Sequence, residues 1–362
     1  MKQHTQISRP KSSPLHPHRL LMSLSLISFT LTIAGCSQPK GALFVPLDPP
    51  LVWPQAPEET RIEYIGSLRT DHDLKPAKHF AKSLTETLFG AKPSQSMLTP
   101  YGVCTDANSR VFVCDSNSQL VHVFDLDSRK YEQWKPDPRD GTLLQPVGVA
   151  FDSLNRLLVS DSQGGIIHVF DSSSQYLGTI GEGILSKPSG ITTDPSNNRI
   201  YVADAGTHQI IVLSFDGELI QRLGKRGTAA GEFNFPTNVA IGDSGSLYVS
   251  DSLNFRVQIF DNNLNHIQQV GSKGDLPGYF SHPKGLALDS DGHLYVIDSH
   301  FESVQIFNSD SKLLLTFGQE GHQPGQFWLP TGIHIDDKDR IWVADSYNQR
   351  VQVFQYHPEN QQ

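Results

Sequence analysis

The sequence lacks several features that would point directly to a function. Its 29 lysine and arginine residues are scattered along the chain and are outnumbered by 38 acidic residues. Because nucleic-acid binding needs positive charge gathered on one surface, we expect no nucleic-acid partner. The sequence also contains no glycine-rich phosphate loop and no recognisable spacing of a nucleophile, a histidine and an aspartate. A binding protein, or an enzyme whose site residues converge from distant positions, is therefore expected.

Long apolar runs are scarce, since only Leu20–Ile33 stands out and it is too short for a confident membrane span. A stretch without acidic residues precedes it and contains the basic residues Lys2, Arg9, Lys11 and Arg19. This order is typical of a signal peptide. The run ends in Ile33-Ala34-Gly35-Cys36, which resembles the lipobox of bacterial lipoproteins, although an ordinary signal peptide or a short buried helix would also fit.

The lipobox resemblance implies an exported protein in which Cys36 is lipidated and becomes the first residue. Several acyl chains on one residue form a stable anchor, whereas a single chain is marginal. Ser37 follows the cysteine, and within that family this favours the outer over the inner membrane, with the domain facing the periplasm. Loss of the leader would remove four positive charges and make the net charge, −9 for the whole chain, more negative. We expect an acidic domain held at the membrane only through Cys36.

From residue 97 onwards the chain repeats one pattern six times. Each repeat opens on a proline and reaches an aspartate fifteen positions later, with one extra residue in the third repeat. The prolines are Pro100, Pro146, Pro188, Pro236, Pro283 and Pro330, and the aspartates are Asp115, Asp161, Asp204, Asp251, Asp298 and Asp345. Alternation of apolar and polar residues around them predicts short antiparallel strands. The repeat length of about 42–48 residues is that of four-stranded propeller blades.

The sixth repeat ends before it can form a fourth strand. In repeats two to five this strand has apolar residues four and one positions before a glycine, and the same pattern occurs upstream as Ile62, Ile65 and Gly66. We therefore predict that residues 60–68 supply the outer strand of the last blade and close the ring, which removes its open edges. The expected fold class is all-β, a six-bladed β-propeller.

The repeats Pro236–Phe260 and Pro330–Phe354 resemble the NHL repeat most closely. Both carry an Asp-Ser pair at the end of the second strand, followed by asparagine, arginine and glutamine at fixed positions. The motif weakens in repeats one to three, where Leu120, Ile166 and Gln209 replace the arginine. The whole layout resembles the NHL-repeat lipoproteins of Gram-negative bacteria, a resemblance that implies the propeller fold but no particular biochemical role.

The predicted organisation has five segments. They are a leader at 1–35, a proline-rich extended tether at 36–59, the closing strand at 60–68, a linker at 69–96 and the six blades at 97–362. In the linker, Phe80, Leu84 and Leu88 recur at four-residue spacing and predict one short amphipathic helix. Because its charges are few and mixed, this helix is expected to pack across the propeller rather than lie on a membrane.

Cysteine is rare, with three in the chain. Cys104 and Cys114 are expected nearly opposite each other on adjacent strands of the first blade. Export would permit a disulfide, and cross-strand neighbours about 4.5–5.5 Å apart are compatible with one. Two buried free thiols that fill small positions would fit equally well.

The histidines do not predict a metal site. Some related propellers, such as the amidating lyase, hold zinc with histidines just after the blade-opening proline, but these positions here hold Tyr101, Val147, Ser189, Thr237, Lys284 and Thr331. Zinc needs about three converging ligands, and His334 alone is expected on an innermost strand, as a hydrogen-bonded core residue. His122 and His168 take a position that glutamine holds in later repeats, so they are expected to be polar packing residues. The Asp-Ser pairs suit turn formation better than calcium binding, and no cofactor is expected.

These observations favour a non-catalytic, monomeric propeller that binds a protein partner in the cell envelope. The loops after the second strands open on one face, and apolar residues gather there in repeats four to six. The candidates are Leu253, Phe255, His300, Phe301 and Tyr347, with Lys284 nearby. Clustered aromatic residues on a polar surface predict an interface, unless they fold down onto neighbouring blades. One alternative is a metal-dependent lyase- or lactonase-like enzyme with three or more polar side chains converging in the central tunnel, and another is a structural spacer.

Overall fold

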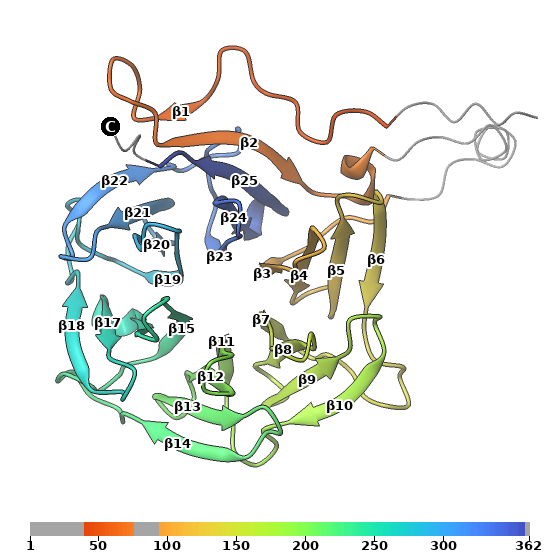
Figure 1. Ribbon diagram of the computed structural model, residues 1–362, viewed down its shortest axis with the longest axis vertical. Helices are drawn as coiled ribbons and strands as arrows, with labels where there is room; N and C mark the ends of the chain where they lie inside the picture. The colour runs from red at the N-terminus through yellow and green to blue at the C-terminus, as the bar shows by residue number, and fades with distance from the viewer. Residues whose placement is uncertain (1–39, 76–93, 359–362) are drawn as a thin grey trace, which may run out of the picture.

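The computed structural model describes residues 40–75 and 94–358, so Cys36 and the helix expected between Pro76 and Gly90 lie outside the described residues. Six antiparallel sheets surround a central axis as blades (Figure 1). Helix in the described part of the chain consists of three short 3-10 turns, η1 (Asp71–Leu74), η2 (Ser252–Asn254) and η3 (Ser346–Asn348). None of these turns is long and apolar enough to cross a membrane. The predicted six-bladed β-propeller is confirmed.

Blades one to three follow one another in order around the ring, each with its first strand innermost. Blade one contains β3 (Pro100–Thr105), β4 (Arg110–Asp115), β5 (Leu120–Asp125) and β6 (Lys130–Trp134). Blade two contains β7 (Pro146–Phe151), β8 (Leu157–Asp161), β9 (Ile166–Phe170) and β10 (Tyr176–Ile180). Blade three contains β11 (Pro188–Asp194), β12 (Arg199–Asp204), β13 (Gln209–Ser214) and β14 (Leu219–Leu223).

Blades four and five have the same four-stranded layout, whereas blade six is completed from the other end of the chain. Blade four contains β15 (Pro236–Ile241), β16 (Leu247–Asp251), β17 (Arg256–Phe260) and β18 (His266–Val270). Blade five contains β19 (Pro283–Leu288), β20 (Leu294–Asp298), β21 (Ser303–Phe307) and β22 (Leu313–Phe317). Blade six contains β23 (Pro330–Ile335), β24 (Arg340–Asp345), β25 (Arg350–Tyr356) and the early strands β2 (Ile62–Leu68) and β1 (Val52–Trp53).

Strand β2 closes the ring by pairing antiparallel with β25, with Tyr64 opposite Phe354. The predicted closing strand is therefore confirmed. The expected free tether differs from the structure, because part of it packs on blade six. Strand β1 pairs with β2, and the Trp53 ring lies 5.7 Å from the Phe317 ring, while Phe44 lies 6.4 Å from Trp342. The apolar residues between the prolines explain this docking, since burial of large aromatic side chains is strongly favourable.

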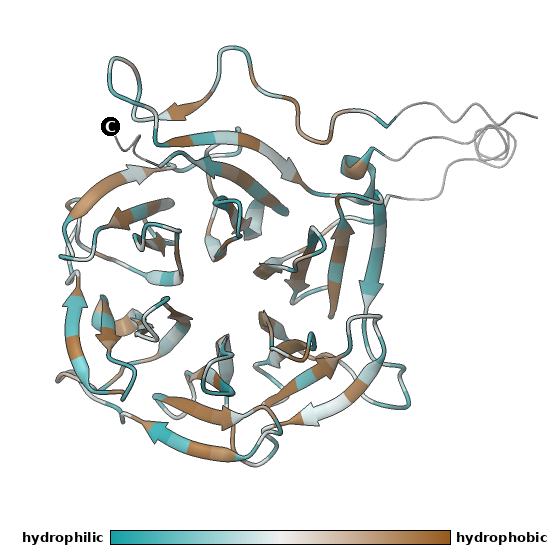
Figure 2. Ribbon diagram, in the orientation of Figure 1, coloured by the Kyte–Doolittle hydropathy of each residue, from teal (hydrophilic) through white to brown (hydrophobic). Residues whose placement is uncertain are grey.

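Apolar side chains fill the spaces between neighbouring blades instead of one central core. One such cluster joins blades one and two through Phe112 and Trp134 on one side and Val149 and Phe170 on the other. The outermost strands alternate between hydrophilic and hydrophobic residues (Figure 2), as β18 does with its exposed and half-buried positions. The period of two seen in the sequence thus separates the faces that pack on neighbouring blades from those that meet water.

The innermost strands approach one another so closely that five blades need a glycine two residues after the opening proline. A Cβ atom at Gly102 would lie 2.4 Å from the Val147 carbonyl oxygen, and one at Gly332 would lie 2.2 Å from the Tyr101 carbonyl oxygen. The equivalent glycines are Gly148, Gly190 and Gly285. Blade four carries Asn238 at this position instead. Glycine here marks close approach of two backbones, and the asparagine is a departure from that rule.

Candidate functional site

A buried aspartate ends the second strand of every blade. Asp115 accepts hydrogen bonds from the amides of Leu98 and Thr99 at 2.6 and 3.1 Å and from the amide of Ser118 at 2.9 Å. Burial alone would raise the pKa of Asp115, but hydrogen bonds from His122 and from these amides hold it at about 2. The repeated aspartates therefore organise turns, as their spacing predicts.

In blades four and six a polar network surrounds this aspartate. Arg350 Nε donates to Asp345 Oδ2 at 2.7 Å, and Gln352 Nε2 donates to the same oxygen at 3.0 Å. Arg350 Nη2 also donates to the carbonyls of Gln323 and Gln326 at 2.8 and 2.7 Å, in the loop that enters the blade. Blade four repeats these contacts with Arg256, Asp251, Gln258, Ala229 and Glu232. The most recognisable motif residues thus fasten a loop and are structural.

His122 takes in blade one the position that glutamine holds in blades four to six. Its Nε2 lies 3.0 Å from Asp115 Oδ2, and its Nδ1 lies 2.6 Å from the Tyr131 hydroxyl. His168 in blade two likewise lies 3.0 Å from the Tyr176 hydroxyl through Nδ1. The prediction that these histidines are polar packing residues is confirmed, because both rings are buried against their own blades.

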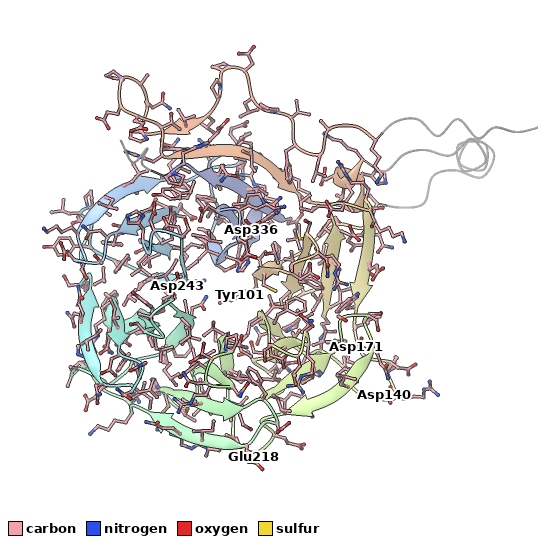
Figure 3. All side chains as sticks on the ribbon, in the orientation of Figure 1. Tyr101, Asp140, Asp171, Glu218, Asp243 and Asp336 are labelled. Atoms are coloured by element: carbon pink, nitrogen blue, oxygen red, sulfur yellow. The ribbon has the colours of Figure 1, made fainter. Side chains whose placement is uncertain are left out.

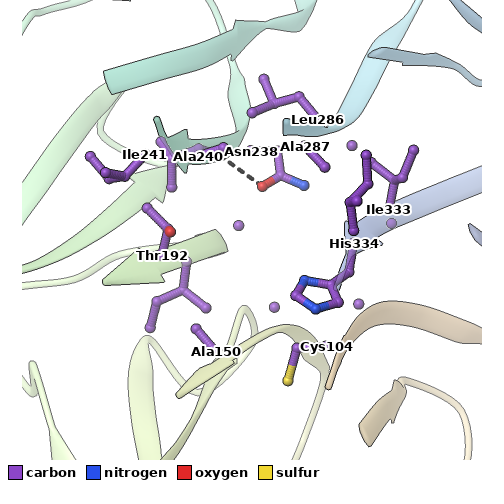
Figure 4. Close-up of a pocket in the computed structure, with 18 of the residues that line it drawn as sticks. Cys104, Ala150, Thr192, Asn238, Ala240, Ile241, Leu286, Ala287, Ile333 and His334 are labelled. Carbon is purple, nitrogen blue, oxygen red and sulfur yellow. Dashed lines mark hydrogen bonds between the residues drawn. The ribbon is translucent and has the colours of Figure 1, made fainter. Parts of the chain in front are cut away.

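A cavity of about 630 Å³ lies between the six innermost strands. Figure 4 shows small residues around it, with the His334 ring on one wall. His334 Nε2 lies 2.9 Å from Thr105 Oγ1, and burial lowers the pKa of His334 to about 4, so that the ring is neutral at pH 7. Across residues 40–75 and 94–358, no group of three His, Cys, Asp or Glu side chains is placed to hold a metal ion. His334 is the hydrogen-bonded residue that the sequence predicts.

Lys284 from blade five and Tyr101 from blade one also line this cavity. The Lys284 ammonium lies 5.7 Å from the centroid of the Tyr101 ring, although blade six stands between their strands in the ring order. Figure 3 places Tyr101 at the central opening. Burial lowers the pKa of Lys284 and raises the pKa of Tyr101. Lys284, a predicted face residue, is thus half-buried and also lines the cavity.

Three of the predicted face residues are exposed. The exposed fractions of Tyr347 and Leu253 are 56% and 43%, and His300 is exposed as well. Phe255 and Phe301 are only half-buried residues, and Phe255 packs against the apolar cluster between blades four and five. Of the two alternatives left open by the sequence, exposure holds for Tyr347, whereas Phe255 folds onto the neighbouring blades.

A model of the NHL repeat matches residues 185–213, 233–260, 280–307 and 327–354. The chain is an NHL-repeat β-propeller. The matched residues are the first three strands of blades three to six and their entering loops, whereas blades one and two keep the blade structure with a weaker motif. A comparison with curated proteins found no match.

Solved structures similar to this NHL-repeat propeller have different described roles. Virginiamycin B lyase from Staphylococcus aureus is 14% identical with a TM-score of 0.54, and the match covers 72% of this chain and 96% of that chain. An auxiliary nutrient binding protein from Bacteroides thetaiotaomicron is 13% identical with a TM-score of 0.57, over 72% of this chain and 70% of that chain. At these identities the likeness shows the fold alone.

Both described cysteines of the propeller are buried free thiols. The register places Cys104 opposite Phe112, so Cys104 and Cys114 are two positions out of alignment rather than nearly opposite. The turn between Thr105 and Val111 sets this register, because Thr105 pairs with Val111 and each earlier residue of β3 back to Val103 pairs one position later on β4. Burial raises the pKa of both thiols, so neither is an activated nucleophile.

Sequence reasoning missed Trp328, which has an exposed fraction of 41%. Its ring lies 5.3 Å from the Tyr347 ring and 5.1 Å from the His322 ring, and together we call these three residues the Trp328 cluster. Trp328 lies in a loop that enters a blade, whereas the predicted loop residues of this face follow the second strands. A tryptophan two positions before Pro330, where other blades have leucine, serine or asparagine, was the available signal.

Proposed function

We propose that this NHL-repeat propeller is a non-catalytic scaffold that binds a protein partner through the Trp328 cluster on blade six. The observation that supports this proposal is a pair of exposed aromatic rings, Trp328 and Tyr347, in contact with each other on one surface. Tryptophan and tyrosine provide most of the binding energy in many protein interfaces, because they bury a large rigid area at little entropic cost.

The backbone under this cluster is held by several hydrogen bonds. The Tyr347 amide donates to the Trp328 carbonyl at 3.1 Å, and the Trp328 amide donates to Asp345 Oδ1 at 2.8 Å. Asn348, which follows Tyr347, donates through Nδ2 to the Gly321 carbonyl at 2.8 Å. A surface that is ordered before binding loses less entropy on association, which favours affinity.

The same proposal places the propeller in the cell envelope. The basic leader and the sequence Ile33-Ala34-Gly35-Cys36 support lipidation of Cys36, export, and membership of the NHL-repeat lipoproteins of Gram-negative bacteria. Docking of Phe44 and Trp53 on blade six would leave only a short free segment between the anchor and the ring. Blade six, which carries the Trp328 cluster, would then be the blade nearest the membrane attachment.

Photo-crosslinking from position 347 in the full anchored chain would test the partner. We expect a specific crosslinked protein, identified by mass spectrometry and then purified for affinity measurement. Trp328→Ala combined with Tyr347→Ala should weaken its binding by more than about tenfold, which is the effect of one or two hot-spot residues. The matched control is Asn117→Ala combined with Gln163→Ala, in the equivalent loops of blades one and two. Equal affinity of the two double variants at wild-type stability would remove the Trp328 cluster as the binding surface.

The anchor has a separate test. Cys36→Ser should abolish incorporation of a labelled fatty acid and release the propeller from the membrane fraction, because no other anchor is expected. Cys104→Ser is the matched control and should leave labelling unchanged. Labelling that survives Cys36→Ser would show that the anchor has been assigned to the wrong residue.

A further inference from the structure

Lys284 is a half-buried cation that lines the central cavity. The Lys284 ammonium contacts the Tyr101 ring, and no ion pair involves it within the described parts of the chain. The charge of Glu302 raises the pKa of Lys284. The Glu302 carboxylate itself accepts a hydrogen bond from the Leu329 amide at 2.6 Å. Removing an ammonium from water without an anionic partner costs several kcal/mol, which an anion bound in the cavity would offset.

Asn238 supplies a second observation in the same cavity. Five blades have glycine at this position, so an asparagine is a local exception among close-packed backbones. Asn238 Oδ1 accepts a hydrogen bond from the Val239 amide at 2.7 Å. Its Nδ2 has no hydrogen-bond acceptor among residues 40–75 and 94–358, which the structure describes. Figure 4 shows this amide in the cavity, with its nitrogen on the side of Ala287. Blade four thus presents a free donor next to blade five, which carries Lys284.

The remaining groups around the cavity select the kind of anion. The Thr331 hydroxyl is already engaged with the Tyr101 carbonyl and Ser346, so it does not face a ligand as a free donor. The rest of the lining is mixed: it has small apolar residues such as Ala150, Ala240 and Ala287, larger ones such as Ile241 and Leu286, and polar ones such as Thr192. One ammonium and one amide donor match the two oxygens of a monoanionic carboxylate better than a phosphate dianion, and the apolar wall suits a short carbon chain.

Acidic residues are found at the far end of the innermost strands. Asp243 and Asp289 line the cavity after the ends of β15 and β19, whereas Lys284 stands at the start of β19. The Asp289 carboxylate accepts hydrogen bonds from the Tyr295 hydroxyl and the His293 amide. The field along the cavity therefore attracts an anion toward Lys284 and away from the acidic end.

We propose that the central cavity binds a free small organic carboxylate, with Lys284 pairing with the carboxylate group and Asn238 Nδ2 donating a hydrogen bond to it. A cavity of about 630 Å³ has the size of small-molecule sites in proteins. This site does not depend on partner binding at the Trp328 cluster, so either proposal can fail while the other holds.

Calorimetric titration of the full chain with acetate, hexanoate and benzoate tests this site. We expect saturable binding of hexanoate or benzoate, no binding of hexanamide, and at least a tenfold loss of affinity in Lys284→Met. Asn238→Gly restores the residue of the other five blades and should weaken binding by about threefold to tenfold, the effect of one hydrogen bond to a charged group. Lys312→Met is the control, since that side chain is 75% exposed, and its affinity should equal that of the wild type.

Two results would overturn the proposal. One is the absence of saturable binding for all three carboxylates up to about 50 mM, a concentration well above the dissociation constant expected for a specific site. The other is equal affinity of the wild type and Lys284→Met, which would show that the carboxylate binds elsewhere. Thermal unfolding without ligand checks that each variant is folded, and Lys284→Met is expected to be at least as stable as the wild type because it removes a half-buried charge whose pKa is lowered by burial.

Discussion

Blades four to six differ from blades one to three in the loop that enters each blade. In the later blades this loop is clamped by the third-strand glutamine, which accepts from a loop glycine and donates to a loop carbonyl. In blade six, Gln352 Oε1 accepts from the Gly325 amide at 2.9 Å and Gln352 Nε2 donates to the Gln326 carbonyl at 2.6 Å. Gln258 and Gln305 make the equivalent contacts. In blades one to three the position holds His122, His168 and Ile211, and this clamp is missing.

The clamped half is also the half that presents aromatic residues to water. The largely exposed aromatic side chains of the described residues are Phe235, Tyr279, Trp328 and Tyr347. Phe235, Tyr279 and Trp328 belong to the clamped loops, and Tyr347 contacts Trp328. The large exposed apolar residues of blades one to three are aliphatic, such as Leu98, Leu144 and Ile220. The NHL motif therefore builds ordered loops, and those loops carry the surface with the character of an interface.

The largest effect is expected where the ring closes, in the clamped half. A chain that begins at Arg69 lacks β1 and β2, so it loses Ile62, Tyr64 and Leu68 from the core and leaves β25 as an open edge. We expect loss of cooperative unfolding or aggregation. A chain that begins at Glu58 keeps β2 but loses Trp53 and Leu51, and it should be less stable by about 2–5 kcal/mol.

Urea unfolding followed by tryptophan fluorescence measures both shortened chains, with a chain that begins at Lys40 as the reference. Equal midpoints for the chains that begin at Lys40 and Arg69 would contradict ring closure by β2. They would also show that blade six is stable with three strands, whereas each of the other blades has four.

A smaller loss is expected from the network that distinguishes blade six from blade one. Arg350→Met removes the partner of Asp345, whose side chain is fully buried, and leaves two loop carbonyls without their donor. Breaking a buried ion pair in this way costs about 3–5 kcal/mol. Blade one has Leu120 at this position and makes no such pair.

The free energy of unfolding of Arg350→Met, measured in urea, should be compared with that of Arg139→Met. Arg139 is 87% exposed, and its loss should change stability by less than about 0.5 kcal/mol. A difference below about 1 kcal/mol between the two variants would mean that the motif arginine is dispensable, and that the two halves of the ring are held together in the same way.

Most of the fold could be predicted from the sequence because the blade is a local structure repeated six times. The proline and aspartate positions fixed the innermost and second strands, and the pattern at Ile62 and Gly66 identified the closing strand. The docking of Phe44 and Trp53 was not predicted, since proline composition suggests a free spacer and the partner surface lies at the other end of the chain. The misalignment of Cys104 and Cys114 was not predicted, because the register of β3 and β4 depends on where the turn between Thr105 and Val111 is centred.

The candidate sites were less predictable because they depend on contacts between blades. Tyr347 was found from its place in a loop, but Trp328 lies in a different loop of the same blade and meets it only after folding. Lys284 was expected near the face candidates, and its contact with Tyr101, two blades away around the ring, was not predicted. The role of Asn238 also required the structure, since the glycine rule it breaks comes from the distance between neighbouring innermost strands.

The smallest effect concerns blade five, which belongs to the clamped half but lacks the motif arginine. Ser303 stands where blades four and six have Arg256 and Arg350, and Glu302 next to it accepts a hydrogen bond from the Leu329 amide of the loop entering blade six. Burial, together with the charges of Asp345 and Glu320, raises the pKa of Glu302 from 4.5 to about 7 against the opposing effects of this hydrogen bond and of the Lys284 charge. This acid therefore ties blade five to blade six in a way that depends on pH.

Glu302→Gln keeps an oxygen acceptor for the Leu329 amide and removes the titration. Because the folded pKa lies above the unfolded value, the folded state binds more protons between pH 4.5 and about 7, so the contribution of Glu302 to stability is full below that range and is lost as the pH rises through it. The stability of Glu302→Gln relative to the wild type should therefore rise by about 1–2 kcal/mol from pH 5 to pH 8. Urea midpoints at both pH values measure this change, with Glu218→Gln as the control because Glu218 is exposed on the rim of blade three (Figure 3). If the two variants follow the same pH dependence, Glu302 titrates normally, and blade five is joined to blade six only by its packing and its glutamine clamp.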